Sequence, residues 1–347
     1  MKIHNILLLC FLLSGSVLSP EPVDAAPLPP PLAVVAQPPV TLSSGWPAVR
    51  LVPDRAISPD EHLVSMQKIK RVLVISFDGM RTDAIEAAPM NNLLGLMDTG
   101  SYTLSNAITI AYPSTLPSHA AMLSGLCMGE NGVIYDRYFK YRGYSKGVDI
   151  FDLAHAANMR TVMIVGKAKL RQLAEPETTD IFEVHYDEAS IGEAAVEQIS
   201  QDFGLMFVHF PSADQVGHRY GWMGGSYLQM LRNGDDALGE MLAALDENGL
   251  RDSTLIIVTA DHGGHKKNHI GTVIEDFRIP WIASGSGIVP GEITALLHTM
   301  DTAATVAYAL RLPLQPDWAG IPVYEAFGET RTRTHPEDVQ WPCHLWN

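Results

Sequence analysis

The chain has 347 residues, 46% of them hydrophobic, which is enough to bury the core of one large domain or of two small ones. Its 39 acidic and 24 basic residues give a formal net charge of −15 at pH 7. This balance argues against a protein that binds nucleic-acid polymers, because such binding uses a basic face. It does not exclude an anionic small-molecule ligand, because bound metal ions can reverse the local field.

The N-terminus has the features of an export signal. Lys2 precedes an apolar run at residues 6–13, which is too short to span a bilayer comfortably, and a small-residue cleavage site ends at Ala25. We therefore predict that residues 1–26 are a secretory signal peptide and that the protein is periplasmic or secreted. No stable membrane insertion is expected after cleavage, and an uncleaved membrane anchor is the alternative.

The remaining chain is predicted to contain one folded domain with extensions at both ends. Residues 27–67 begin in a proline-rich stretch and are predicted to be a spacer and N-terminal extension. The folded domain is predicted at residues 68–330, and residues 331–347 form a tail. Without the signal peptide two cysteines remain, Cys127 and Cys343, and the sequence leaves open whether they form a disulfide or stay as two thiols.

Apolar, β-branched runs alternate with helical patterns from residue 71 onward. Buried strands are predicted at residues 71–77, 161–165, 205–210 and 255–259, with a weaker one at 279–283. Helices are predicted at residues 90–97, 120–126, 231–245 and 302–310. This alternation predicts an α/β fold with a mostly parallel central sheet and helices on both faces. Residues 135–146 interrupt it, either as a loop or small cap beside the active site or as a solvated excursion.

Polar side chains follow three of the predicted strands. They are Asp78 after the first, Asp214 and His218 after the third, and Asp261, His262, His265 and His269 after the fourth. In open α/β sheets ligands bind at the carboxyl ends of the strands, and carboxylates and imidazoles are ligands of zinc. Each residue also has a structural interpretation, such as a turn for Asp78. The coincidence at three strand ends favours a metal site.

The stretch AYPSTLPSHAAMLSGL at residues 111–126 has two interpretations. It has the pattern of a helix start, with Ser114 or Thr115 as the N-cap and Pro117 in the first turn. The same end of the helix can also present a hydroxyl, that of Thr115, for chemistry. The nearby His119 is predicted to be structural.

The motifs taken together resemble those of the alkaline phosphatase superfamily. The order is Asp-Gly, T-x-P-x-H, D-x-x-x-H and then DHGG-x-x-x-x-H, and within the superfamily it is most similar to the type I phosphodiesterase / nucleotide pyrophosphatase family. The similarity runs from about residue 71 to residue 326. It implies an alkaline-phosphatase-like three-layer sandwich, with residues 68–330 as the catalytic domain of a compact, bacterial type.

The resemblance also implies two Zn²⁺ ions per chain. One would be held by Asp78, Thr115, Asp261 and His262, and the other by Asp214, His218 and His269. His269 is preferred to His265 because related enzymes place their last ligand just before a segment like residues 270–272. His265 then remains a nearby base or a spare ligand.

The implied activity is that of an exported hydrolase of phosphodiester or phosphoanhydride bonds in small, nucleotide-type molecules, acting through a phosphothreonine at Thr115. Ser118 stands where family members often carry an asparagine that donates to a phosphoryl oxygen. Lys167 is either a partner for an anionic group of the substrate or the solvated start of a helix. A phosphomonoesterase, a phosphonate hydrolase and a non-catalytic binding protein remain alternatives. A sulfatase is disfavoured, because it would carry C/S-x-P-x-R at the nucleophile.

Overall fold

The structure is a computed structural model and describes residues 66–330. Its main sheet has eight strands in the order β5-β4-β6-β1-β7-β8-β2-β9. Their bounds are β1 Arg71–Phe77, β2 Ser101–Thr103, β4 Thr161–Val165, β5 Ile181–Val184, β6 Leu205–Phe210, β7 Thr254–Thr259, β8 Trp281–Gly285 and β9 Gly291–Glu292. A separate two-stranded sheet pairs β3 (Ala107–Ile108) with β10 (Leu297–His298).

Strand β1 lies at the centre of the sheet, between β6 and β7. Both neighbours are parallel to it, and Ser76 near its end is opposite His209 of β6 and Thr259 of β7. Every residue of these three strands is buried, which explains why their sequences are nearly continuous apolar runs. This register brings the carboxyl ends of the three strands to one edge of the sheet.

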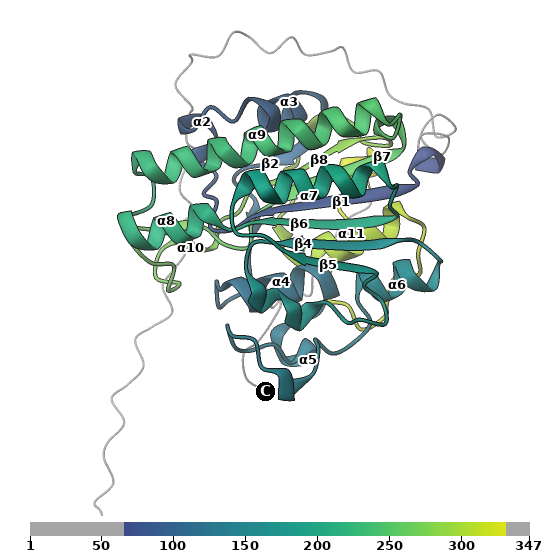
Figure 1. Cartoon of the computed structure of the whole chain (residues 1–347), viewed down its shortest axis with the longest axis horizontal. Coiled ribbons are helices and arrows are strands. Elements are labelled where there is room, and N and C mark those ends of the chain that lie inside the picture. Colours follow the sequence, from purple (N-terminus) through teal and green to yellow (C-terminus); the bar gives the residue numbers. More distant parts are fainter. Residues whose placement is uncertain (1–65, 331–347) are drawn as a thin grey trace, which may run out of the picture. The chain divides into compact units, whose positions relative to one another are not determined.

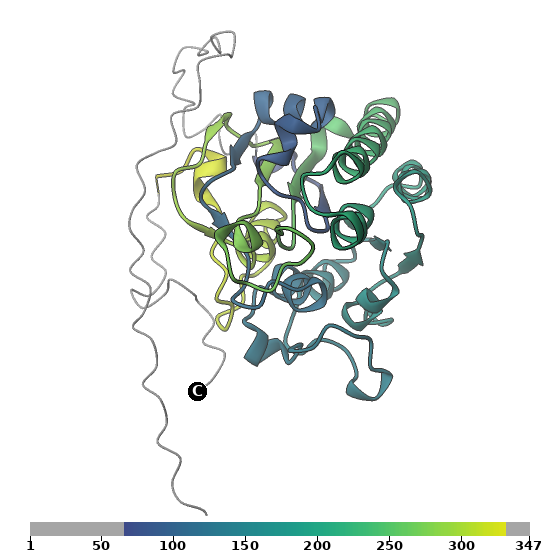
Figure 2. The same ribbon diagram turned by 90° about the vertical axis from the view of Figure 1, so that its left-hand side faces the viewer.

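Helices cover both faces of the main sheet. The α-helices are α2 Ala84–Ala87, α3 Asn91–Thr99, α4 Thr115–Ser124, α5 Met128–Asn131, α6 Ile150–Ala156, α7 Glu188–Ser200, α8 Ser212–Tyr220, α9 Gly225–Glu247, α10 Ile274–Phe277 and α11 Asp301–Ala309. Short 3₁₀ turns are η1 Lys140–Arg142, η2 Ala168–Leu173, η3 Arg251–Ser253 and η4 Tyr324–Phe327. Helices α7 and α9 lie side by side in front of the strands, and α11 lies behind them (Figure 1). The same layers are seen edge-on in Figure 2.

The predicted fold class, a mostly parallel α/β sheet covered by helices on both faces, is confirmed. Strands β1, β4 and β6 have the predicted bounds. The weaker strand starts two residues later than predicted, at Trp281 directly after Pro280, and runs antiparallel to β7. The interrupting segment at residues 135–146 contains only the turn η1, with its residues mostly at the surface.

The predicted signal peptide, most of the spacer, the tail and Cys343 lie outside the described residues, so both alternatives for Cys127 and Cys343, a disulfide or two thiols, stay predictions. Between residues 66 and 330, no helix combines the length and the apolar character needed to cross a membrane.

Candidate active site

The predicted polar residues lie close together at the carboxyl ends of the three central strands. Asp78 directly follows β1, and Asp261 and His262 follow β7 after a single alanine. Asp214 and His218 lie one turn apart on α8, which starts two residues after β6. His269 comes from the loop between β7 and α10 and joins them. The structure thus brings together residues that are up to 191 positions apart in the sequence.

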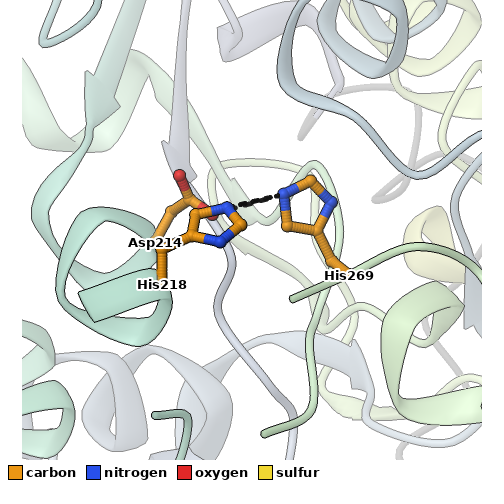
Figure 3. A group of neighbouring side chains, drawn as sticks. All are labelled: Asp214, His218 and His269. Atoms are coloured by element: carbon orange, nitrogen blue, oxygen red, sulfur yellow. Dashed lines mark hydrogen bonds and ion pairs between the residues drawn. The ribbon is translucent and has the colours of Figure 1, made fainter. Parts of the chain in front are cut away.

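Asp214, His218 and His269 form the first candidate metal group (Figure 3). Nε2 of His218 lies 3.3 Å from Oδ1 of Asp214, and Nε2 of His269 lies 3.6 Å from the same oxygen. The two Nε2 atoms are 3.0 Å apart. All three ligand atoms point at one another, as the sticks in Figure 3 show.

The Nδ1 atoms of these histidines contact backbone carbonyls, which shows that Nδ1 carries a proton in both rings. Nδ1–H of His218 donates to the carbonyl of Lys267 at 3.0 Å, and Nδ1–H of His269 donates to the carbonyl of Pro113 at 2.7 Å. A neutral ring with its proton on Nδ1 presents a bare lone pair at Nε2. Burial lowers the pKa of His269 to about 4, so its ring is neutral at pH 7. Both Nε2 atoms lie close to Oδ1 of Asp214 and 3.0 Å from each other, and a cation bound by all three atoms would satisfy them together, so this group has the character of a cation site.

Asp78, Asp261 and His262 form the second group. Nε2 of His262 lies 3.6 Å from Oδ1 of Asp78 and 3.4 Å from Oδ2 of Asp261, while its Nδ1–H donates to the carbonyl of Gly263 at 2.8 Å. The ring of His262 stacks on that of His269 with centroids 3.8 Å apart, which joins the two groups. Asp214 also belongs to a cluster with Asp78 and His262 whose ligand atoms all lie within 4.8 Å of one another.

Four of these ligand atoms are buried without a hydrogen-bond partner. They are Oδ1 of Asp78, Oδ1 of Asp214, Oδ2 of Asp261 and Nε2 of His262. An unpaired buried carboxylate oxygen or ring nitrogen costs about 1–3 kcal/mol, and such atoms are rare in folded proteins. All four face the other members of the two groups, and their donor types suit zinc. The residues therefore fit the implied metal centre.

The remaining oxygens of the carboxylates are fixed by other contacts. Oδ1 of Asp261 accepts from the amides of Gly79 and His262, both at 3.0 Å. Burial and the neighbouring Asp78 raise the pKa of Asp261 well above its ordinary value. Burial also opposes ionisation of Asp78, but Lys167 and the hydrogen bond from His209 hold its pKa well below the ordinary value.

Thr115 and Lys167 lie beside the two groups. Thr115 is the first residue of α4, with Ser114 as its N-cap, and its side chain is almost completely buried. Nζ of Lys167 lies 3.2 Å from Oγ1 of Thr115, 2.8 Å from Oδ2 of Asp78 and 2.5 Å from Oδ2 of Asp214. The ammonium thus contacts Oδ2 of both carboxylates, while Oδ1 of each carboxylate faces the candidate metal groups.

The interpretation of Lys167 as a solvated helix start is wrong, because only 14% of its side chain is exposed. Burial alone would lower the pKa of Lys167, but the carboxylates of Asp78 and Asp214 raise it above its ordinary value. The side chain therefore stays an ammonium. It can stabilise negative charge on the Thr115 oxygen, and it cannot act as a general base there.

Two further predicted residues point elsewhere. Ser118 is fully buried, and its Oγ accepts from the Thr109 hydroxyl at 3.1 Å and from the Ser114 amide at 3.4 Å, so its role as a substrate donor stays a prediction. His265 pairs with Asp276 at 2.7 Å and belongs to neither candidate metal group, whereas His269 does.

Sequence reasoning missed several residues that support the site. His209 on β6 accepts from the amide of Gly166 at Nδ1 and donates from Nε2 to Oδ2 of Asp78 at 2.9 Å. A single imidazole in an otherwise apolar buried strand was the available signal. Trp222 donates from Nε1 to the carbonyl of Gly79 at 2.9 Å and packs edge-on against His218. His119 matches its predicted structural role, since its ring is buried between the Thr115 carbonyl and the Ser76 hydroxyl.

Comparisons with known proteins show the family of the chain. The family described as type I phosphodiesterase / nucleotide pyrophosphatase matches residues 72–277. Human ectonucleotide pyrophosphatase/phosphodiesterase family member 7 is 24% identical over 219 residues, which are 56% of this chain and 47% of that protein. A Xenopus laevis protein named bis(5'-adenosyl)-triphosphatase enpp4 is 22% identical over 214 residues, with the same coverage of 56% and 47%. The chain thus spans about half the length of the curated relatives it matches.

A solved structure supports the fold. Murine ectonucleotide pyrophosphatase / phosphodiesterase 5 superposes with a TM-score of 0.61 at 13% identity, over 74% of this chain and 99% of that one. The family match covers more than half of the chain and includes both candidate metal groups and the helix that begins at Thr115. The chain belongs to the type I phosphodiesterase / nucleotide pyrophosphatase family.

Proposed function

We propose that this chain is an exported, two-zinc hydrolase of phosphodiester or phosphoanhydride bonds in small nucleotide-type molecules, with Thr115 as its nucleophile. The observation that carries the proposal is the position of Thr115 Oγ1. It lies at the N-terminus of α4 and 3.2 Å from an ammonium that also binds two carboxylates of the candidate metal groups. Residues 68–330 form the catalytic domain in this proposal.

The residues assigned to the metals are those brought together by the strand ends. Asp78, Asp261, His262 and Thr115 would hold one Zn²⁺, and Asp214, His218 and His269 the other. Two bound zinc ions would supply Lewis acidity to the attacking and the leaving oxygens. His209 positions Asp78 through its hydrogen bond, in the way that partners of metal-ligating side chains commonly do.

The chain's own residues account for the remaining steps. The ammonium of Lys167 and the helix end stabilise the Thr115 oxygen as it loses its proton to solvent water. Its Oγ1 attacks phosphorus and forms a bond to it, and the leaving oxygen departs with the electron pair of the broken bond and takes up a proton from water. Water then attacks the phosphothreonine, releases the phosphoryl product and restores the threonine hydroxyl. The name of the Xenopus relative suggests dinucleotide polyphosphates as one substrate group to try.

The test uses the zinc-loaded protein, a bis-aryl phosphate and a Thr115→Ala variant. We expect the variant to lose at least about a thousandfold in kcat, as nucleophile removal commonly does, while its fold and zinc content stay unchanged. Ser114→Ala is the matched control, because it removes a neighbouring hydroxyl that makes no side-chain capping bond. Acid quenching of the wild type should trap a phosphorylated threonine in the peptide that contains Thr115.

Retained activity in Thr115→Ala would remove this residue from the mechanism. A mono-aryl phosphate tested alongside distinguishes the diesterase from the phosphomonoesterase alternative, because the preferred substrate has the higher kcat/KM. Absence of zinc and of turnover would favour a non-catalytic binding protein.

A further inference from the structure

The N-terminus of α4 offers few amides to a substrate oxygen. Pro117 has no N–H, and the amide of Ser118 donates to the carbonyl of Ser114 at 2.9 Å. The amides of Thr115 and Leu116 remain. The amide of Leu116 donates to Oδ1 of Asp136 at 2.9 Å, and that of Thr115 has no acceptor in the part of the chain that the structure describes. One amide is thus open beside the proposed nucleophile, and the next is taken by a carboxylate.

Asp136 is held in this position from its other side. Nζ of Lys169 lies 2.8 Å from its Oδ1 and 2.7 Å from its Oδ2. Lys169 follows β4 two residues after Lys167, which contacts Thr115. The carboxylate comes from the segment at residues 135–146, and its side chain is 34% exposed while that of Lys169 is 21% exposed. A fixed acidic group therefore lies one residue from the proposed nucleophile.

The negative charge of Asp136 affects phosphodiesters and phosphomonoesters differently. A phosphodiester carries one negative charge near neutral pH, whereas a phosphomonoester carries close to two. The N-terminus of a helix attracts anions, but here the carboxylate of Asp136 already takes one of its amides and repels a second anionic oxygen. Lys169 offsets part of this repulsion and is itself occupied by Asp136.

We propose that Asp136 is a specificity-determining residue, which favours singly charged phosphodiesters over doubly charged monoesters at the Thr115 site. This inference rests on the proposed function. It assigns to the loop at residues 135–146 a role in substrate choice. A purely structural cap of α4 is the competing explanation, since Ser114 makes no side-chain capping bond of its own.

Substitutions at Asp136 and Lys169 distinguish an effect of the Asp136 charge from the loss of a cap on α4. Asp136→Asn keeps an oxygen that can accept from the Leu116 amide, removes the negative charge and releases Lys169. We expect its kcat/KM ratio of mono-aryl to bis-aryl phosphate to rise about tenfold over the wild type, a modest change because both side chains are partly exposed and screened. Lys169→Met leaves Asp136 uncompensated and should lower the same ratio. The double variant should return toward the wild-type ratio.

Binding gives a second readout that needs no turnover. By titration calorimetry of the zinc-loaded protein, Asp136→Asn should tighten the binding of inorganic phosphate by about tenfold and that of the singly charged dimethyl phosphate by only about threefold. Equal changes for the two ligands, or equal losses of kcat/KM for both substrates, would show a structural cap and overturn the inference. If the wild type turned over neither substrate, the proposed function would fail, while the two calorimetric affinities would still decide the role of Asp136.

Discussion

Replacement of Asp261 by Asn should have opposite effects on the metal-free and the zinc-loaded protein. Nε2 of His262 lies 3.6 Å from Oδ1 of Asp78 and 3.4 Å from Oδ2 of Asp261, so these two oxygens are at most about 7 Å apart. Both carboxyl groups are fully buried. At that distance and an effective dielectric constant of about 20, two negative charges repel by about 2 kcal/mol.

In the metal-free protein this cost is only partly offset. Asp78, Asp214 and Asp261 meet a single buried ammonium, that of Lys167, and burial raises the pKa of Asp261 well above its ordinary value. A raised carboxyl pKa means that the folded state becomes less stable relative to the unfolded state as the pH rises through that pKa. Asp261→Asn removes this loss, and its amide oxygen can still accept from the amides of Gly79 and His262.

Urea unfolding at pH 8 measures both effects. With EDTA, Asp261→Asn should be about 2 kcal/mol more stable than the wild type. With saturating zinc the order should reverse, because the variant has lost a ligand and gains less free energy from the metal. A metal-free variant no more stable than the wild type, or an equal gain of both proteins from zinc, would refute this account of the site.

Three further predictions concern single residues. Because the folded pKa of His269 is about 4 against an ordinary 6.5, the metal-free protein should lose up to about 3 kcal/mol of stability as the pH falls from 6.5 to 4, and His269→Gln should lack this part of the pH dependence in urea titrations. Lys167→Met should destabilise the metal-free protein by about 3–5 kcal/mol, and added zinc should recover part of the loss; an unchanged unfolding midpoint would contradict the buried ion pairs. Gly79 has a φ of +72°, and an added Cβ would lie 3.1 Å from Cβ of Asp214, so Gly79→Ala should cost about 2 kcal/mol and lower the zinc content. Gly95→Ala is its control, since Gly95 lies in α3 with nothing within 4 Å of the new Cβ, and should be neutral or slightly stabilising in thermal unfolding.

The sequence allowed the centre of the fold to be predicted because the central strands are buried on both faces. A run such as RVLVISF has no polar alternation, so its bounds could be set to the residue. The edge of the sheet was not predictable in the same way. Strands β2 and β9 have three and two residues, which is too short for an alternation of apolar and polar residues to be recognised. Strand β2 pairs with β8 and with β9, and both pairings depend on tertiary contacts.

The same contrast holds for the site. Asp78 and Asp261 each come just after a buried strand, and therefore their convergence follows from the parallel sheet alone. The contact of His209 with Asp78 depends on the register of β6 against β1, and that of Asp136 with Leu116 depends on an irregular loop. Burial of Lys167 was unexpected because lysine is rarely buried without a partner, and its partners come from two other strand ends.

In the proposed function, seven side chains from separate parts of the sequence hold two zinc ions beside the Thr115 oxygen. Anomalous diffraction at the zinc absorption edge, from crystals of the zinc-loaded protein, tests it most directly. We expect two peaks per chain, one among Asp214, His218 and His269 and the other among Asp78, Asp261, His262 and Thr115. Fewer than two peaks at these positions, or peaks bound only by other side chains, would contradict it.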